Sequence, residues 1–453
     1  MLSINLVRYT TKHMRDDTTL LADATAVLKE NDRGTYTMPA GKLYPHQWLW
    51  DSCFTAIGLR HLDVYRAQTE LLSLLRGQWQ NGMIPNMIFS SDPAFKRDSS
   101  AWHSSLSPSA PDDIATSGIT QPPMLAEAVV QVGEKLSWPE RRLWYRQMWS
   151  GLLAYHEWLY AERDPHQEGL VLLIHPWETG LDNTPPWMEY LKDHQLPWWI
   201  RLLDTTGLDH AVSLFRRDTR SVPVNERFSD LEVLALYDTQ RRLRRKGYDI
   251  TRILDHTLFA IEDLSFNSIL IRANQHLRDI AKSIREEIPE ELDTSIKKTE
   301  KTFDQLWDDL SQQYYSRDFV THKWLRESSI ATLLPLYAGH ISKERAARLV
   351  RLIENPHQFG TRFPLPSVPR TSAYFDPKRY WQGPTWINMN WLVIDGLRRY
   401  GFDDHAEVLS EMTLELVRTH GASEYFDPMD GSPLGVENFS WSAALAIDLL
   451  KSN

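Results

Sequence analysis

Apolar residues recur along this chain mostly at intervals of three or four positions, the spacing that places them on one face of an α-helix. The clearest stripes cover 64–79, 277–288 and 406–416; Asp63 precedes the first, Pro289 ends the second and Gly421 follows the third, as typical helix caps and stops do. Similar patterns cover 15–30, 121–134, 138–162, 229–246, 256–270, 290–314, 342–354, 384–400 and 439–451. Since alternating, strand-like stretches are scarce, the pattern predicts an all-α protein of about a dozen helices.

Long polar segments separate the predicted helices, at about 80–120, 163–187, 202–228 and 355–383. Loops of this length in a compact domain usually carry function. Within the first, the segment 85–119 is rich in Ser, Pro and Asp, and we expect it to form a lid. Neither a repeat of fixed length nor a break in composition divides the chain, so a single domain over 1–453 is expected.

Composition narrows the class of protein. A hydrophobic fraction of 42% suits a well-packed globular chain, and a formal net charge of −10 argues against nucleic acid as a partner. The single Cys53 permits no internal disulfide, and the 16 His show no spacing typical of a metal site. The sequence shows neither a signal-peptide pattern nor an apolar run that would predict a membrane span. We therefore expect a cytoplasmic protein without metal or cofactor; a homo-oligomer is compatible with the sequence.

Aromatic residues and carboxylates gather in four short clusters. They lie at 44–51 (YPHQWLWD), 175–187 (HPWETGLDNTPPW), 380–386 (YWQGPTW) and 423–428 (SEYFDP). Such neighbours suit a sugar, because a ring covers the apolar face of a pyranose and a carboxylate binds hydroxyls or moves protons. Each cluster alone also has a structural interpretation: Asp51 as a helix cap, Trp177 and Trp187 as core residues, and Asp182 as a turn cap. Four clusters in a chain with 18 Trp favour a cleft built from several helix ends.

These segments resemble the signature segments of a known family. QWLWDSCF, ETGLDNTP, YWQGPTWINMNW and SEYFDP are similar, in content and in order, to those of glycoside hydrolase family 63. The resemblance runs from about Tyr44 to Trp441 and is strongest for the bacterial glucosylglycerate and mannosylglycerate hydrolases. Trehalases share a W-D segment and the late E-Y pair, but their acid loop reads differently, which makes them the nearest alternative.

The resemblance implies an (α/α)6 barrel, a toroid in which six inner and six outer helices surround a single central pocket covered by long loops. It also implies an inverting, exo-acting α-glycosidase that acts without a cofactor. By position, Asp182 matches the family's general acid and Glu424 its general base. The residues that match its sugar-binding set are Tyr44, Trp48, Trp50, Asp51, Gln121, Trp177, Tyr380, Trp381 and Trp386.

The two carboxyl groups suit these roles on physical grounds. An inverting glycosidase needs a protonated carboxyl at the leaving oxygen and an ionised one that activates water, about 6.5–9.5 Å apart. Apolar residues and prolines flank Asp182, and burial among them favours the protonated form. Glu178 competes for the acid role on sequence alone, whereas the position of Asp182 in the motif matches the family. Glu424 lies so far along the chain that only the fold brings it to Asp182.

The leading hypothesis is hydrolysis of a small-molecule α-glucoside or α-mannoside, most simply glucosylglycerate or mannosylglycerate, to the free sugar and glycerate. A glycerate carboxylate needs a cation, and Arg216 with its neighbour Arg217 offers one on a loop, although both also suit surface ion pairs. The motifs do not choose between glucose and mannose, which differ only at the C2 hydroxyl. Two alternatives stay open: an oligosaccharide-processing α-glucosidase or trehalase-like hydrolase, and a non-catalytic sugar-binding protein.

Overall fold

The computed structural model describes residues 15–41, 43–194 and 222–452, and this part of the chain is mostly helical. Its helices are α1 (Asp17–Asn31), α2 (Leu49–Leu59), α3 (Val64–Arg76), α4 (Lys96–Trp102), α5 (Leu125–Gly133), α6 (Trp138–Arg163), α7 (Pro185–His194), α9 (Asp230–Arg245), α10 (Ile250–Leu254), α11 (Leu264–Ile284), α12 (Glu290–Thr302), α13 (Pro335–Ala338), α14 (Lys343–Glu354), α15 (Ile387–Arg399), α16 (Asp403–His420) and α17 (Ser440–Ser452).

The strands are two residues long and pair antiparallel, β1 with β2, β3 with β6, β4 with β5 and β7 with β8. They are β1 (Gln47–Trp48), β2 (Met87–Ile88), β3 (Ile261–Glu262), β4 (Trp307–Asp308), β5 (Gln313–Tyr314), β6 (Arg317–Asp318), β7 (Tyr425–Phe426) and β8 (Pro433–Leu434). Each pair fixes a short stretch of loop rather than building a layer of its own.

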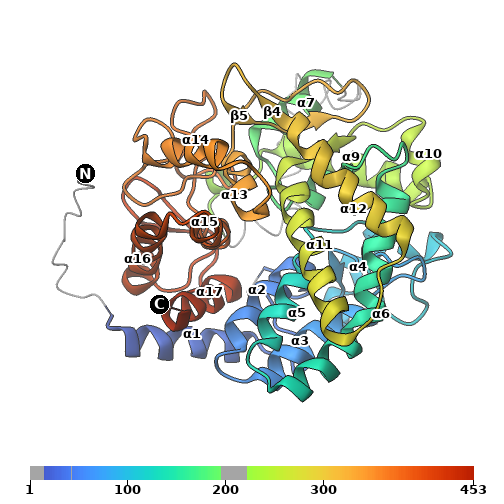
Figure 1. Cartoon of the computed structure of the whole chain (residues 1–453), viewed down its shortest axis with the longest axis horizontal. Helices are drawn as coiled ribbons and strands as arrows, with labels where there is room; N and C mark the ends of the chain where they lie inside the picture. The colour runs from blue at the N-terminus through green and yellow to red at the C-terminus, as the bar shows by residue number, and fades with distance from the viewer. Residues whose placement is uncertain (1–14, 42, 195–221, 453) are drawn as a thin grey trace.

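Among the described helices, one set packs in a closed sequence. α2 contacts α5, α5 contacts α11, α11 contacts α13, α13 contacts α15, α15 contacts α17, and α17 contacts α2. A second set, α1, α3, α6, α12, α14 and α16, packs on the outside of the first. Figure 1 shows the first set around the middle of the molecule, with the second set nearer the rim.

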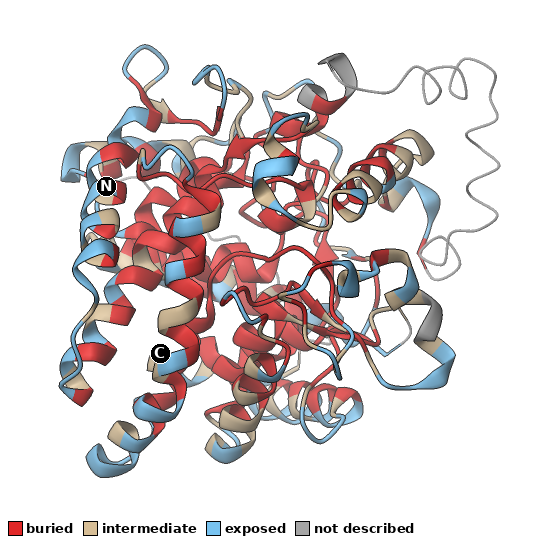
Figure 2. Ribbon diagram, turned by 90° about the vertical axis from the view of Figure 1, so that its right-hand side faces the viewer, coloured by how far each residue is buried: buried red, intermediate tan, exposed pale blue. Residues whose placement is uncertain are grey.

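Burial follows this division. Every residue of α2 is buried, and so are 10 of the 13 residues in each of α15 and α17, whereas α14 in the outer set buries only Ala346, Leu349 and Val350. Figure 2 shows the same contrast, with buried segments in the middle and exposed turns outside. Gly58 lets α2 and α17 approach closely, because a Cβ there would lie 2.4 Å from the Ala444 backbone. A helix that is apolar on all sides is stable only when it is surrounded in this way.

The helical patterns of the sequence are largely confirmed, with two exceptions. The stretches 256–270 and 277–288 overlap one helix, α11, which begins only at Leu264, after β3, and ends at Ile284; Asp263 caps it by accepting a hydrogen bond from Phe266 N. The polar residues between them do not break the helix, because two of them are buried with hydrogen-bond partners: Asn274 contacts His156 and Tyr160, and His276 contacts Glu127. The helix predicted over 290–314 ends at Thr302, and Trp307–Asp308 then pairs with Gln313–Tyr314. The Asp308 side chain accepts from Leu310 N and so stabilises the turn that separates these strands.

The loop predictions are confirmed in part. Residues 355–383 contain neither helix nor strand, as expected. The segment 85–119, expected to be a loop, carries β2 and α4, and 163–187 includes a 3-10 turn and the start of α7. The loop 202–228 lies mostly outside the described residues. No helix in the described part of the chain is both long and apolar enough to cross a membrane.

Candidate active site

Two adjoining cavities lie where the segments that precede α2, α5, α15 and α17 meet. The inner cavity is lined by Pro39, Tyr44, Trp48, Trp50, Asp51, Gln121, Gly180, Asp182, Tyr380, Trp381, Glu424, Phe439 and Trp441. The lining of the outer cavity includes the apolar residues Leu43, Met87, Phe89, Trp102, Trp177, Phe228 and Val233. Tyr44, Trp48, Asp182 and Tyr380 line both cavities, so they mark the junction between them.

The inner cavity combines aromatic walls with buried polar groups that have no protein partner. Trp48 Nε1, Gln121 Oε1 and Trp441 Nε1 are buried, and none of the described residues hydrogen-bonds them. Burial raises the pKa of Asp51 well above its usual range, and the nearby charges of Glu424, Asp182 and Glu70 act in the same direction. A protonated Asp51 both donates and accepts hydrogen bonds. Buried polar groups normally find partners, so this set suits a ligand rich in hydroxyls.

Asp182 is held at the junction by the turn that precedes it and by a tyrosine. The Tyr380 hydroxyl donates a hydrogen bond to Asp182 Oδ2 at 3.1 Å. Gly180 has a φ of +73°, and a Cβ there would lie 2.4 Å from the Trp50 ring, so the turn needs glycine on both counts. Burial raises the pKa of Asp182 to about 7, while the Tyr380 hydrogen bond and the charge of Arg227 oppose the rise. A carboxyl with this pKa is protonated in a large fraction of molecules near neutral pH.

Glu424 immediately precedes β7, and both of its carboxylate oxygens accept hydrogen bonds. Oε1 accepts from the Tyr44 hydroxyl at 2.9 Å and from Arg227 Nη1 at 3.1 Å. Oε2 accepts from Arg227 Nη2 at 2.5 Å and from Val436 N at 3.1 Å. Every partner is a donor, which is the environment of an ionised carboxylate. The backbone pairing of Glu424 N with Val436 O fixes the segment that carries the side chain.

Of the carboxyl groups that line the site, Asp182 and Glu424 have contrasting environments. Asp182, with a raised pKa, lines both cavities, and Glu424, an acceptor at every hydrogen bond, lines the inner one. A pair of titratable groups whose environments differ in this way is the usual arrangement for general acid–base catalysis. The arrangement suits hydrolysis of a bond that lies across the junction of the cavities.

Comparison with known proteins identifies the family. Residues 44–442 match the family described as the mannosylglycerate hydrolase MGH1-like glycoside hydrolase domain. The chain belongs to this family. It is 39% identical over 426 residues to a mannosylglycerate hydrolase of Thermus thermophilus, with 94% of this chain and 99% of that protein covered. It is 32% identical over 450 residues to the glucosylglycerate hydrolase of Mycolicibacterium hassiacum, with 96% and 98% covered.

A solved structure agrees with this assignment. The crystal structure of a GH63 mannosylglycerate hydrolase from Thermus thermophilus, in complex with Tris and D-glycerate, superposes with a TM-score of 0.85. It is 37% identical and covers 96% of this chain and 100% of the solved chain. The resemblance to glycoside hydrolase family 63 inferred from the motifs is thereby confirmed, and the chain is an enzyme of the glycoside hydrolase class.

Most of the predicted site residues of this glycoside hydrolase lie in the inner cavity. Tyr44, Trp48, Trp50, Asp51, Gln121, Asp182, Tyr380, Trp381 and Glu424 all line it. Asp51 lies inside α2 rather than at its cap, because Trp48 holds the N-cap position. Trp177 lines the outer cavity instead, whereas Trp187, with 0% of its surface exposed, is a core residue.

Trp386 does not line either cavity, contrary to the expectation that it contacts the sugar. Its ring stacks on that of Trp381, with centroids 3.8 Å apart and planes 2° from parallel. Its Nε1 donates to Tyr380 O, so the side chain is buried with its polar atom satisfied. Trp386 therefore packs behind Trp381, which lines the cavity. The motif alone does not show which of the two tryptophans faces the cavity.

Glu178, the rival for the acid role, is a structural residue. Arg163 donates to both of its oxygens, at 2.8 and 3.2 Å, and Ile174 N and Thr120 N donate as well. Its side chain is fully buried and lines neither cavity. Glu178 thus joins the end of α6 to the loop that carries Asp182.

Arg216 and Arg217, the predicted cations for an acidic aglycone, lie outside the described residues. The structure adds a cation that the sequence did not indicate, Arg227, which pairs with Glu424. Arg227 lies two residues before Ser229, the N-cap of α9, and nothing in the neighbouring sequence predicts an ion pair there. Its partner, Glu424, comes from a distant segment of the chain. Phe439 and Trp441 also line the inner cavity and were missed, since the pattern explains them as core residues of the last helix.

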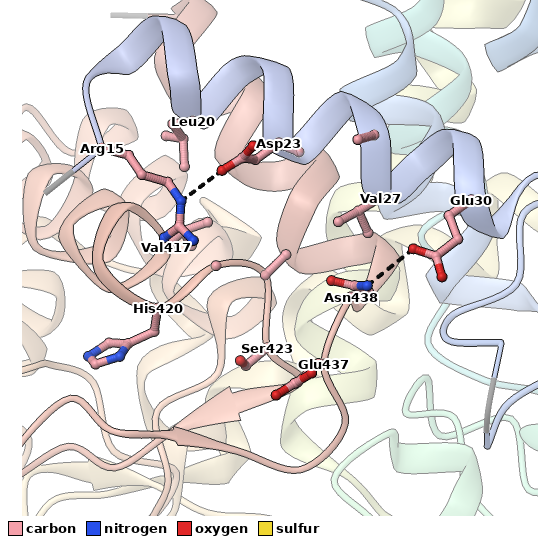
Figure 3. Close-up of a pocket in the computed structure, with 14 residues that line it drawn as sticks. Arg15, Leu20, Asp23, Val27, Glu30, Val417, His420, Ser423, Glu437 and Asn438 are labelled. Carbon is pink, nitrogen blue, oxygen red and sulfur yellow. Dashed lines mark hydrogen bonds and ion pairs between the residues drawn. The ribbon is translucent and has the colours of Figure 1, made fainter. Parts of the chain in front are cut away.

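A further groove lies on the other side of the Glu424 segment, between α1 and the residues around Glu437 (Figure 3). Arg15 pairs with Asp23 at 2.7 Å, and Asn438 donates to Glu30 at 3.1 Å. The second contact ties α1 to the loop that follows Val436, a hydrogen-bond donor to Glu424.

Proposed function

We propose that this chain hydrolyses an α-linked glycosylglycerate to the free sugar and glycerate, with inversion at the anomeric carbon. The observation that carries the proposal is the place of Asp182, a carboxyl with a pKa of about 7 at the junction of an inner and an outer cavity. A glycosidic oxygen at that junction has the sugar on one side and the aglycone on the other. The names of the similar hydrolases, and the D-glycerate bound in the similar structure, support glycerate as the aglycone.

In the proposed reaction Asp182 is the general acid and Glu424 the general base. As the bond between the anomeric carbon and the glycosidic oxygen breaks, Asp182 gives its proton to that oxygen and glycerate leaves. A water attacks the opposite face of the anomeric carbon and gives its proton to Glu424. The products are the sugar of inverted configuration and glycerate, and the carboxyl groups then exchange protons with solvent to regain their first states.

The remaining roles follow from the linings of the cavities. We assign the sugar to the inner cavity, with Trp50 and Trp381 in its aromatic wall and Asp51 and Gln121 at its hydroxyls. We assign the aglycone to the outer cavity, which α4 helps to close: Asp98 of α4 lies 3.0 Å from His46 Nε2, and Trp102 lines the wall. The segment 85–119 would then act as the lid expected from its length, ordered over the outer cavity.

For the fold, we propose that the two concentric sets of helices form an (α/α)6 barrel in one domain. The closed packing sequence from α2 through α17 supports the inner ring, and the helices packed on it support the outer ring. Long loops at one end of such a barrel would enclose a pocket for a small-molecule substrate, which agrees with an exo-acting enzyme.

A panel of matched substrates tests this function. The panel contains α-glucosylglycerate, α-mannosylglycerate, the two corresponding glycosylglycerols, trehalose and a short α-glucan. We expect one glycosylglycerate to give the highest kcat/KM, with trehalose and the glucan hydrolysed far more slowly. A preference for trehalose would instead support the trehalase-like alternative, and binding of glycosylglycerate without any turnover would support a sugar-binding protein.

A further inference from the structure

The carboxylate of Glu424 has no free hydrogen-bonding position in this structure. It accepts from Tyr44, from two nitrogens of Arg227 and from Val436 N, at 2.5 to 3.1 Å. A carboxylate offers about four lone-pair positions, so all of them are in use. A general base must accept a proton from water along a lone pair, within hydrogen-bond reach. One of these donors therefore has to move before Glu424 can act.

Arg227 is the donor best placed to move. Val436 N is fixed by the backbone pairing with Glu424. The side chains of Tyr44 and Arg227 both line the outer cavity, on the aglycone side, but of the two only Arg227 is a cation that an aglycone carboxylate attracts. Arg227 Nε is buried, and none of the described residues accepts its hydrogen bond. The guanidinium carbon lies 4.9 Å from the centre of the Tyr380 ring and 5.8 Å from those of Tyr44 and Tyr425. These faces stabilise the cation whichever carboxylate it binds.

We infer that the carboxylate of the substrate replaces Glu424 as the counter-ion of Arg227 and so frees the base. This inference rests on the proposed function, which places an acidic aglycone in the outer cavity. There the aglycone carboxylate accepts from Arg227 Nε and one Nη, and the guanidinium turns away from one oxygen of Glu424. The attacking water then hydrogen-bonds that oxygen and transfers its proton to it. The charge of the aglycone thus acts on the chemical step in addition to binding, and Arg227 is a positioning residue.

Added acetate provides the test in the wild-type protein. The substrate is the glycosylglycerol that carries the preferred sugar, which has the same linkage as the glycosylglycerate but no carboxylate. We expect its kcat to be roughly ten- to a hundredfold below that of the glycosylglycerate, the size of effect that one charge-assisted hydrogen bond supports. Millimolar acetate should raise that kcat severalfold and saturably, by supplying the missing counter-ion, while sodium chloride at equal ionic strength should not.

Variants of Arg227 extend the test. In Arg227→Gln the acetate effect should disappear and the kcat values of the two substrates should become similar; Arg227→Lys should retain part of the preference. Arg379→Gln is the matched control, because Arg379 pairs with Glu232 at 3.0 Å, lines neither cavity and should leave the acetate response intact. Since the loss of a buried ion-pair partner is often destabilising, thermal unfolding of each variant is measured alongside.

The outcomes separate this inference from the proposed function. If wild type hydrolyses the glycosylglycerate but acetate leaves the glycosylglycerol kcat unchanged or lowers it, the counter-ion exchange is wrong and the function stands. The same conclusion holds if the two substrates differ in KM alone. If wild type hydrolyses neither compound, the proposed function itself is wrong, and the inference falls with it.

Discussion

Replacing Asp182 with Asn tests whether burial keeps the Asp182 carboxyl protonated in the folded protein. An ordinary Asp titrates near 3.9, whereas burial raises the pKa of Asp182 to about 7. At pH values between these two pKa values, the Asp182 carboxyl stays protonated in the native protein but is ionised in the unfolded chain. Wild type therefore loses stability as pH rises from about 4 to about 7, and the loss is complete above that. Asn does not titrate, so Asp182→Asn lacks this dependence.

The size of the effect follows from the pKa shift. The linkage relation gives a loss of about 2.6 kcal/mol between pH 5 and pH 8, and partial exposure of the side chain to the cavity reduces it to about 2 kcal/mol. For 453 residues the entropy of unfolding at the midpoint is about 1 kcal/mol/K, so the expected change is about 2 °C. The Tm of Asp182→Asn relative to wild type should therefore rise by about 2 °C from pH 5 to pH 8.

Thermal unfolding of both proteins at pH 5 and pH 8 measures this difference. Asp113→Asn is the control, because that Asp is exposed and the variant should show no comparable change with pH. The same pKa should appear in catalysis, as a fall of wild-type kcat/KM on glycosylglycerate when pH rises through about 7. A Tm difference independent of pH, together with activity that stays constant well above pH 8, would refute the assignment of a protonated Asp182.

Three further predictions follow from individual contacts. Glu424→Gln should stay folded but lose roughly 10²–10⁴-fold in kcat, as expected for removal of a general base, and a stopped assay on the glycosylglycerate measures this. Glu178→Gln should lower the Tm through its pairing with Arg163 while leaving the pH profile of kcat unchanged. Gly435→Ala should lower kcat with little change in KM, because φ is +71° there and a Cβ would lie 2.6 Å from Glu424 Oε2.

The sequence predicted the helices well because their apolar periodicity is local. In α3 and α16, the apolar residues of the buried face lie next to a cap or stop residue in one short stretch of sequence, Asp63 for α3 and Gly421 for α16. It failed at 290–314, where the residues of β4 and β5 also fit a helical pattern and only their pairing decides the structure. The closed order of packing among α2, α5, α11, α13, α15 and α17 depends on contacts between distant segments, which no window of sequence contains.

The sequence predicted those site residues that lie in a short motif with both aromatic and carboxylate side chains. The segments around Asp182 and Glu424 combine aromatic residues with carboxylates, and the structure places both carboxyl groups in the inner cavity. Trp386 carries the same local signal, yet it stands behind Trp381. Arg227 gave no signal at all, because an arginine in a polar stretch acquires its role only from the distant Glu424 and the three rings around it.

If Asp182 and Glu424 act as acid and base in the hydrolysis of an α-glycosylglycerate, the reaction inverts the configuration of the anomeric carbon. Proton NMR of the first turnovers tests it most directly, with the glycosylglycerate that the substrate panel identifies and at a rate faster than mutarotation. We expect the β-anomer of the free sugar to appear first, together with glycerate, and Asp182→Asn and Glu424→Gln each to form it roughly 10²–10⁴-fold more slowly. Early appearance of the α-anomer would mean a retaining reaction, and would contradict the assignment of Glu424 as the base that activates water.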